Sequence, residues 1–537
     1  MTVPESTLPT LISPHNRALP LLTLTDLRIL EAQAAATLPE HTLMSRAGKA
    51  AASYLQERIT RDTSIEKSKH KVWVAAGPGN NGGDALIMAA ELHRAGIAID
   101  LCMPLEVKPN DARWALDTAR AAGVAITTTP PASLESYTWL VDGMFGIGLT
   151  RPLEGIFATI ARQLSQRTKA KSRRGGVLAL DTPSGLDSDT GTVVSERRGP
   201  AENQSDGAVV HATHTITFIG AKPGLFTAQG RDLAGTVIVA PIGIDSSTRP
   251  AVQLNAPELF AAFLPPRDFA TNKGTFGSLA VVGGDTGMCG AAILASRAAL
   301  YTGAGKVHVA LLGDGAPSYD PPHPELMLHA IDDLPLDQMD ALAVGCGMGH
   351  RDRATRVMHD VLPLDVPKLF DADALNLISK DPSLAAEVTA RGVQGDPCVL
   401  TPHPLEAARL LGTDAAGVQR DRLAAARALA ARFASVVVLK GTGTVIAAPD
   451  GRVAINPTGN AALATGGTGD VLGGIIGALL AQHLPRYEAA LAGVYLHGLA
   501  ADRLSAQGHG PAGLTAGELA PMVRTLLNRM FYPAAAE

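Results

Sequence analysis

Short apolar runs alternate with longer helix-like segments along the first half of the chain. The pattern predicts helices over residues 25–36, 42–59, 85–95 and 112–122, and strands over 72–76, 97–102, 139–142, 176–180, 215–219 and 236–240. Regular alternation of strand and helix is typical of a parallel, doubly wound sheet. We therefore expect an α/β domain in this half, with its ligand at the carboxyl ends of the strands.

The second half repeats this alternation. Strands are expected over residues 278–282, 307–311, 341–344, 368–370, 398–400 and 436–439, helices over 290–301 and 422–433, and a hairpin over 445–455. Residues 241–266 mix proline, serine and short apolar pieces, which is typical of a domain boundary. We therefore divide the chain into α/β domains at 1–245 and 246–537, and we expect residues 190–210 to form a surface loop of the first.

The segment Thr465–Gly474 contains five glycines, two threonines and one acid, and it runs into the apolar residues 475–480. A glycine-rich loop entering a helix N-terminus suits an anion, because the first amides of the helix are unpaired. The segment lacks the Lys-Ser/Thr ending of a Walker A motif. Asp470 beside such a loop either activates a hydroxyl group or simply caps the helix.

Three polar clusters follow strands in the first half, namely residues 79–84, 142–150 and 181–187. Each alone could be a helix cap, but three clusters at strand ends favour one shared pocket. Their Asn, Asp and Ser oxygens are hard ligands that suit an alkali or alkaline-earth cation.

Composition narrows the class of protein. With 46% hydrophobic and 18% charged residues, the chain can build substantial cores, and its net charge of -5 does not favour nucleic acid. The four cysteines form no CxxC pair, so we expect no structural zinc site or disulfide framework. Neither a signal peptide nor a membrane-spanning stretch is recognisable, and we expect a cytoplasmic protein.

The first half resembles a known family. The motifs GPGNNGGD, VDGMFGIG and LDTPSGLD, in this order, look like the NAD(P)H-hydrate epimerase domain of the YjeF N-terminal type, over roughly residues 20–245. The resemblance implies a Rossmann-like three-layer fold. It also implies an enzyme that interconverts the R and S epimers of hydrated NADH and NADPH. Ala85 departs from the usual glycine.

The same resemblance implies the site. Asp181 would be the acid–base residue, and Asn81, Asp142 and Ser184 would hold a potassium ion. The substrate would contact Asp181 and the residues Asn80, Asn81, Gly82, Gly83, Asp84, Gly146, Ile147, Gly148, Leu149, Thr150, Arg151 and Pro152.

The second half resembles another family. KGxxG, GGD, GxGxG, DADALN, TPHPxEAARL, VVLKGxGT and TGGTGDVL, in this order, look like ADP- or ATP-dependent NAD(P)H-hydrate dehydratase of the YjeF C-terminal type. The match covers roughly residues 265–530. It implies a ribokinase-like fold. It also implies an enzyme that phosphorylates the substrate hydroxyl and then expels phosphate.

This resemblance implies a second site, in which Asp470 would take the hydroxyl proton and magnesium would accompany the nucleotide. The nucleotide would contact Lys440, Gly441, Thr442, Gly443, Thr444 and Gly469, and the substrate Ala291, Gly347, His403 and Asp470. Cys346 and Leu405 depart from the usual proline and glycine. Without the family, His403 could order a turn, Lys440 could be solvated, and Asp371 and Asp373 could be ordinary caps.

Together these features predict a bifunctional metabolite-repair enzyme, expected to be a homo-oligomer. Its ligands would be hydrated NADH and NADPH with ADP or ATP, without nucleic acid or membrane. One alternative is a ribokinase-superfamily small-molecule kinase fused to a Rossmann-like binding domain. Another is a binding module without catalysis, against which the presence of Asn80, Asn81, Asp84, Asp142 and Asp181 weighs.

Overall fold

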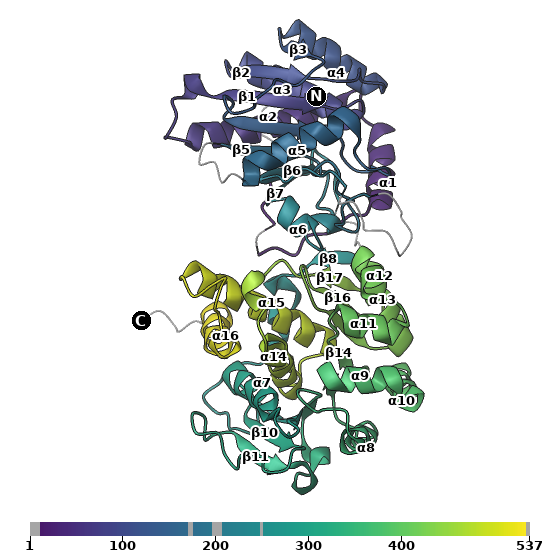
Figure 1. Ribbon diagram of the computed structural model, residues 1–537, viewed down its shortest axis with the longest axis vertical. Coiled ribbons are helices and arrows are strands. Elements are labelled where there is room, and N and C mark those ends of the chain that lie inside the picture. Colours follow the sequence, from purple (N-terminus) through teal and green to yellow (C-terminus); the bar gives the residue numbers. More distant parts are fainter. Residues whose placement is uncertain (1–10, 15, 170–174, 196–206, 247–250, 533–537) are drawn as a thin grey trace. The chain divides into compact units, whose positions relative to one another are not determined.

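The computed structural model describes residues 11–14, 16–169, 175–195, 207–246 and 251–532 (Figure 1). The chain divides into two compact units, one extending to Val252 and the other beginning at Gln253, with Asn16–Ala18 grouped with the second. The central part of the expected surface loop, residues 196–206, lies outside the described residues. Among the described residues, no helix combines the length and apolarity needed to cross a membrane.

The first unit is built on a seven-stranded parallel sheet of order β3-β2-β1-β4-β5-β6-β7. Its strands are β1 (Lys71–Ala76), β2 (Ala98–Cys102), β3 (Ala125–Thr127), β4 (Trp139–Gly143), β5 (Gly176–Leu180), β6 (His214–Phe218) and β7 (Thr236–Ala240). The order reverses between β1 and β4, and such a switch point is where ligands bind in open α/β sheets. The expected doubly wound sheet is confirmed, with the short edge strand β3 added.

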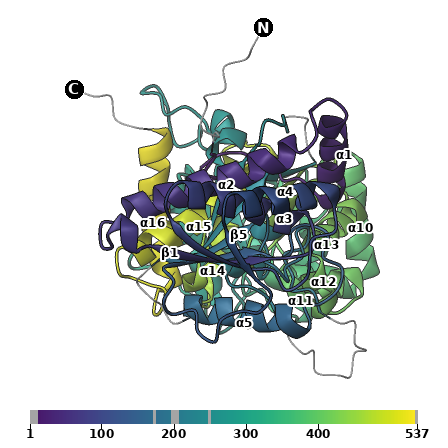
Figure 2. The same ribbon diagram turned by 90° about the horizontal axis from the view of Figure 1, so that it is seen from above.

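Helices cover both faces of this sheet (Figure 2). On one face lie α2 (Thr42–Arg61), α3 (Asn80–Arg94) and α4 (Asn110–Ala121), and on the other lies α5 (Gly155–Lys169). The remaining helices of the unit are α1 (Leu24–Ala35) and the short α6 (Gly230–Leu233). The unit therefore has the three-layer architecture that the resemblance implied.

Helix α3 begins five residues earlier than the sequence pattern predicted, at Asn80 instead of Ala85. The Asn- and Gly-rich segment 80–84 therefore forms the first turns of the helix. A Cβ added at Gly82 would lie 1.9 Å from the Gly77 carbonyl oxygen, so glycine lets this turn approach the end of β1. The glycines that suggested a loop serve close packing instead.

The second unit is built on a ten-stranded sheet of order β11-β10-β9-β12-β13-β14-β15-β16-β17-β8. Its strands are β8 (Val252–Leu254), β9 (Ser278–Gly283), β10 (Lys306–Leu311), β11 (Met327–Ala330), β12 (Ala341–Val344), β13 (Lys368–Phe370), β14 (Val399–Leu400), β15 (Val436–Leu439), β16 (Val445–Ala447) and β17 (Val453–Ile455). Strands β9 to β15 are parallel, and β16 and β17 form the expected antiparallel hairpin. The pattern missed β8 and β11.

One face of this sheet carries α7 (Cys289–Thr302), α14 (Thr468–Ala481), α15 (Arg486–Ala506) and α16 (Ala516–Phe531), which share one hydrophobic core with it. The other helices of the unit are α8 (Asp352–Val361), α9 (Ala372–Lys380), α10 (Pro382–Val393), α11 (Pro404–Leu411), α12 (Ala415–Arg420) and α13 (Arg422–Phe433). Helix α14 lies in the middle of the core and is buried along nearly its whole length. It is the apolar segment that follows the glycine-rich loop.

The approach of α14 to α7 depends on Gly474. A Cβ at this position would lie 1.9 Å from the Ala295 carbonyl oxygen, which belongs to helix backbone and cannot move away cheaply. We expect Gly474→Ala to destabilise the second unit by about 3 kcal/mol or more, as overpacking does in a rigid core. Calorimetry of the full chain measures this loss.

The matched control is Gly517→Ala on the exposed side of α16, where an added Cβ meets nothing within 4 Å. Alanine in a helix is intrinsically better than glycine by up to about 1 kcal/mol, so this variant should be neutral or stabilising. Equal melting behaviour of the two variants would contradict the packing argument.

Candidate functional site

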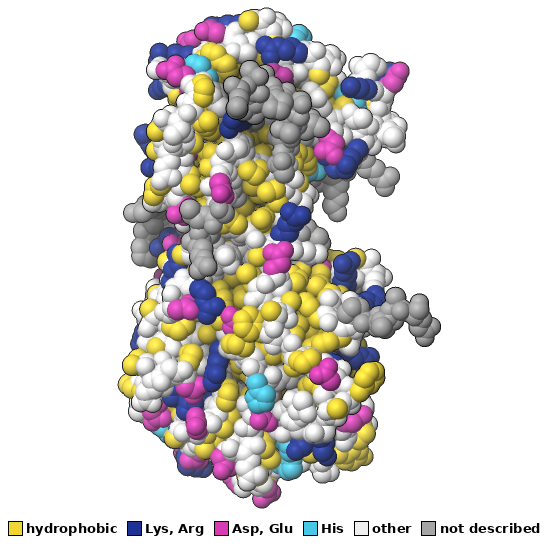
Figure 3. Space-filling model, turned by 180° about the vertical axis from the view of Figure 1, so that it is seen from behind, with side chains coloured by type: hydrophobic (Ala, Val, Ile, Leu, Met, Phe, Trp, Pro, Cys, Tyr) yellow, Lys and Arg dark blue, Asp and Glu magenta, His cyan; other side chains and the backbone are white. Residues whose placement is uncertain are grey.

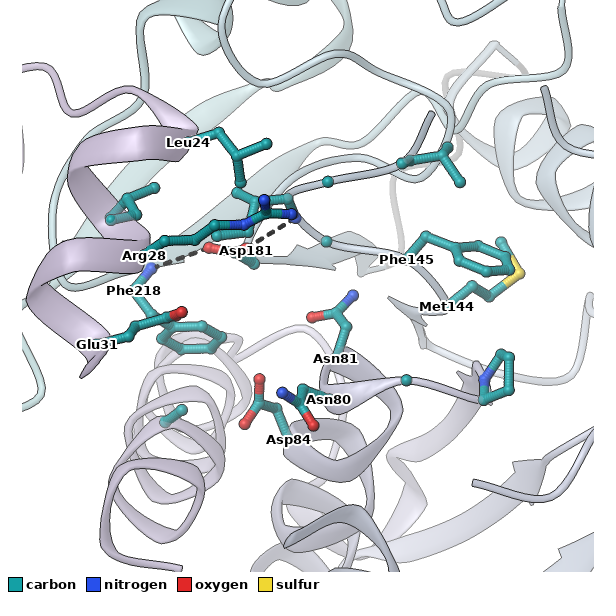
Figure 4. Close-up of a pocket in the computed structure, with 18 of the residues that line it drawn as sticks. Leu24, Arg28, Glu31, Asn80, Asn81, Asp84, Met144, Phe145, Asp181 and Phe218 are labelled. Atoms are coloured by element: carbon teal, nitrogen blue, oxygen red, sulfur yellow. Dashed lines mark hydrogen bonds between the residues drawn. The ribbon is translucent and has the colours of Figure 1, made fainter. Parts of the chain in front are cut away.

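A cavity of about 1200 Å³ opens at the carboxyl ends of the first sheet (Figure 4). The strands β1, β4, β5 and β6, which are neighbours, lead into its polar wall. Of the residues predicted from sequence, those that line it are Asn80, Asn81, Asp84, Gly146, Ile147, Gly148, Leu149, Thr150, Arg151, Pro152 and Asp181. Gly82 and Gly83 do not line it, because they face the Gly77 carbonyl and Met44 within the packed layer.

Asp181 is held in an uncommon conformation at the end of β5. Its φ is 64°, in the left-handed region. The ammonium group of Lys222 donates a hydrogen bond to Asp181 Oδ1 at 2.6 Å and to Thr217 and the Phe218 carbonyl at 2.7 and 2.8 Å. Lys222 is only 1% exposed, so its positive charge is matched chiefly by Asp181. Lys222 was not singled out from the sequence.

Four further carboxyl groups line the same cavity, and burial shifts the pKa of two of them, Glu31 and Asp84. Burial and the neighbouring Asp181 raise the pKa of Glu31, and burial with the carboxylates of Asp181 and Glu31 raises the pKa of Asp84. Glu31 comes from α1 and was not expected in the site, since a glutamate on an amphipathic helix gives no functional signal by itself. The cavity thus gathers three acidic side chains around one buried lysine.

Below this wall, Asp142 and Ser184 form a tight buried pair. The Ser184 amide donates to Asp142 Oδ2 at 2.7 Å, and its hydroxyl donates to Oδ1 at 2.6 Å. Burial raises the pKa of Asp142 to about 6, although the hydrogen bonds from Ser184 oppose this. Within the described residues, neither the amide oxygen nor the amide nitrogen of buried Asn81 has a hydrogen-bond partner.

The second unit also gathers polar side chains at neighbouring strand ends. Asp371 follows β13, Glu406 lies on α11 after β14, and Lys440 follows β15. The Lys440 ammonium lies 2.6 Å from Asp371 Oδ1 and 4.0 Å from Glu406 Oε2. Asp371 also caps α9, as the sequence suggested, but its pairing with Lys440 makes it part of the site.

The N-terminus of α14 faces this group. Helix α14 begins at Thr468, so Asp470 lies in its first turn, where helix amides are unpaired. A Cβ added at Gly469 would lie 3.6 Å from Lys440 Nζ, which places the ammonium beside the first amides. Burial and the neighbouring Asp371 raise the pKa of Asp470, and burial with the Asp470 carboxylate raises that of the Cys346 thiol.

The turn 440–444 is shaped from behind by Arg422, which is 1% exposed. Its guanidinium donates to the Leu439 and Lys440 carbonyls, both at 3.1 Å. A Cβ at Gly441, whose φ is 132°, would lie 2.9 Å from this guanidinium. Glycine is therefore required here by both backbone conformation and space. Thr442 to Thr444 complete the turn, with the Thr444 hydroxyl donating to the Gly441 carbonyl.

Besides Asp470, the residues predicted to bind the substrate of the second unit lie in two separate segments of the structure. Gly347 and Ala291 are neighbours, since a Cβ at Gly347 would lie 3.1 Å from that of Ala291. His403 caps α11, where its Nδ1 accepts hydrogen bonds from the Leu405 and Glu406 amides. Its Nε2 lies 3.3 Å from Glu406 Oε1, so Glu406 stands between His403 and Lys440.

Glu406 makes the stability of the second unit depend on pH. Burial raises the pKa of this carboxyl from 4.5 to about 7. Between these values the folded chain holds a proton that the unfolded chain has released, so the free energy of unfolding falls as pH rises. We expect a fall of up to about 3 kcal/mol in wild type and a smaller one in Glu406→Gln. Calorimetry at pH 5 and pH 8 measures this fall in the free energy of unfolding. An equal fall in wild type and in Glu406→Gln would contradict the role of Glu406.

Two family models match the chain. One, described as YjeF-related protein N-terminus, matches residues 40–224, and the other, described as NAD(P)H-hydrate dehydratase, matches residues 279–523. The first contains most of the cavity wall, and the second contains Lys440 and Asp470.

Two named relatives are similar to this chain over most of its length. Proteins of Coxiella burnetii and Escherichia coli, both named bifunctional NAD(P)H-hydrate repair enzyme Nnr, are each 36% identical, covering 91% and 94% of this chain and 96% and 93% of their own. A Neisseria meningitidis ADP-dependent (S)-NAD(P)H-hydrate dehydratase is 48% identical over 52% of this chain and 92% of its own. A Bacillus subtilis ADP/ATP-dependent NAD(P)H-hydrate dehydratase structure, co-crystallised with ATP and Mg²⁺, is 34% identical over 51% of this chain and 98% of its own, with a TM-score of 0.46. With both domains present and the match running nearly end to end, the chain belongs to the family of bifunctional NAD(P)H-hydrate repair enzymes.

Proposed function

We propose that the two units act in sequence on hydrated NADH and NADPH. The first unit interconverts the R and S epimers, and the second uses ADP or ATP to remove water from the S epimer. The observation that carries this proposal is the pair of polar strand-end sites, one with three carboxyl groups around Lys222 and one with Lys440 and Asp470 at a helix N-terminus.

In the first site, epimerisation requires the hydroxyl group to leave the hydrated carbon and return on its other face. A carboxyl group can assist departure and later activate water, and Asp181 is our candidate. Asp181 forms an ion pair with Lys222, whereas burial raises the pKa of Asp84. Carboxyl groups in environments as different as these suit acid and base roles.

A potassium ion fits beside this wall. The buried Asn81 amide oxygen has no partner among the described residues, and Asp142 and Ser184 supply further hard oxygens. These three residues would hold the ion, which would fix the loops and steady developing charge. The chain's own contribution is to keep Asp181 and Asn81 on the same side of Gly146.

In the second site, Asp470 would take the proton of the substrate hydroxyl as its oxygen attacks the terminal phosphorus of the nucleotide. The α14 amides and Lys440 would steady the charge of the transferring group. The raised pKa of Asp470 brings it closer to neutral pH, where a general base works best. The transfer releases AMP from ADP or ADP from ATP. Phosphate then leaves as the C–O bond of the hydrated carbon breaks, the adjacent ring carbon loses a proton, and the double bond of NAD(P)H is restored.

Magnesium would accompany the nucleotide. Within the described residues, no three His, Cys, Asp or Glu side chains gather as a ready-made metal site. Mg²⁺ is commonly held by substrate phosphates together with only one or two carboxylates. A site without a three-residue cluster of metal ligands is therefore compatible with a magnesium ion bound to the nucleotide. The nucleotide would contact the turn 440–444 and Gly469, and the hydrated nicotinamide would contact Ala291, Gly347, His403 and Asp470.

The distribution of charge on the surface fits small-molecule ligands better than nucleic acid. On the face drawn in Figure 3, the described basic and acidic side chains are interspersed instead of forming a basic stripe. With a net charge of -5, this does not favour nucleic acid. We propose a cytoplasmic homo-oligomer, and size-exclusion chromatography with light scattering tests the assembly.

The deciding experiment supplies an R/S mixture of hydrated NADH with Mg²⁺, K⁺ and either ADP or ATP. Absorbance of the dihydronicotinamide ring reports recovery. Complete recovery, beyond the S fraction and faster than spontaneous epimerisation, is expected from both activities. Recovery that stops at the S fraction would contradict the epimerase, and a stable phosphorylated product from another alcohol, without recovery, would favour a kinase.

A further inference from the structure

Helix α1 brings two charged side chains to the cavity of the first unit. Arg28 and Glu31 lie three residues apart, so they share one face of the helix, and both line the cavity. This helix precedes residue 40, where the match to the family model begins. It therefore adds to the site two side chains that none of the motifs contains.

The Arg28 guanidinium is available to a ligand. Within the described part of the chain, it donates no hydrogen bond and forms no ion pair, although it lowers the pKa of Glu31 against the larger effects of burial and Asp181. A Cβ added at Gly148 would lie 3.5 Å from Arg28 Nη2, so the guanidinium lies over the loop 146–152. Figure 4 shows it extending from α1 toward the side of the cavity that holds Asp181.

Charge is unevenly distributed over the cavity wall. Arg28 and Arg151 are exposed, whereas Asp181 is 8% exposed and Glu31 and Asp84 are half-buried. The wall also carries two exposed acids, Asp111, which pairs with His41, and Glu154. The lysine of the wall, Lys222, is already occupied by Asp181. A ligand with an anionic part and a neutral part would therefore place the anionic part at the two arginines and the neutral part at the buried and half-buried carboxyl groups of Asp181, Glu31 and Asp84.

We propose that Arg28, together with Arg151, binds the phosphate groups of the hydrated dinucleotide and so orients its nicotinamide end toward Asp181. This inference rests on the epimerase function proposed above. A guanidinium suits the task because its planar donors can bind phosphate oxygens in pairs. Arg28 is in this view a specificity residue, while the chemistry stays with the carboxyl groups.

The test measures R-epimer consumption by the full-length enzyme with excess nucleotide, over a range of R-hydrate concentrations. For Arg28→Gln we expect KM for hydrated NADPH to rise about tenfold with kcat little changed, as for a lost charge-assisted contact. Arg28→Lys should recover part of the loss. The dependence of KM on salt concentration should also be weaker in Arg28→Gln than in wild type.

Two controls separate binding from damage. Dehydration of pure S epimer by the same Arg28→Gln sample should keep its wild-type rate, and Arg120→Gln, on the exposed side of α4, should keep wild-type KM. An unchanged KM in Arg28→Gln, while wild type epimerises, would overturn the role of Arg28 and leave the proposed function standing. Absence of epimerisation in wild type would overturn both. A larger KM effect for hydrated NADPH than for hydrated NADH would assign Arg28 to the 2′-phosphate, and an equal effect to the pyrophosphate.

Discussion

Asp470→Asn is expected to abolish nucleotide-dependent dehydration of the S epimer while epimerisation continues. Asn keeps the shape of the side chain in the first turn of α14 but cannot accept the hydroxyl proton. Removing a general base costs typically about 10²–10⁴-fold in rate. The measurement follows dihydronicotinamide absorbance with pure S epimer, and epimerisation is followed separately by chromatographic resolution of R and S.

The matched control for this variant is Asp414→Asn, which removes one carboxylate from the same unit at the cap of α12. It should retain dehydration within about twofold, since surface substitutions away from a site are usually mild. Loss of both activities in Asp470→Asn would contradict separate active sites. Retention of dehydration would leave Asp470 with only a charge effect in the first turn of α14, whose N-cap residue is Gly467.

Most strands of both sheets were predictable because they are short apolar runs separated by segments rich in glycine and polar residues. The strands that the pattern missed, β3, β8 and β11, are only three or four residues long, and each lies at an edge of its sheet. The predicted start of α3 was wrong for a different reason. Glycine is a poor helix former by itself, and only the close approach of Gly82 to Gly77 explains it within a helix.

The sites were predictable to the extent that their residues follow strands. Asp181 and Lys440 could be placed because β5 and β15 lead directly to them. Arg28 and Glu31 could not, because they lie on a helix far from the motifs. Asp371 was predicted only as a cap. Its place before a helix suggests that it accepts a hydrogen bond from the Ala372 amide, but nothing local in the sequence indicates the ion pair with Lys440.

The second substitution with a large expected effect is at Asp181, which pairs with Lys222. We expect Asp181→Asn to reduce epimerisation to the spontaneous rate, so that the R epimer accumulates while S-epimer dehydration is unchanged. Asn suits this position because it tolerates the left-handed conformation better than most residues. R epimer consumed faster than it epimerises spontaneously would show that Asp181 is not the acid–base group.

The same substitution leaves the buried Lys222 ammonium without its carboxylate, which should destabilise the first unit by about 3 kcal/mol. All three tryptophans, Trp73, Trp114 and Trp139, lie in this unit, so fluorescence during urea denaturation reports its unfolding alone. Adding Lys222→Met to Asp181→Asn removes the unpaired charge and should restore most of the stability without restoring epimerisation. If the double variant also regained epimerisation, Asp181 would serve only to neutralise the lysine, and the acid–base role would pass to Asp84 or Glu31.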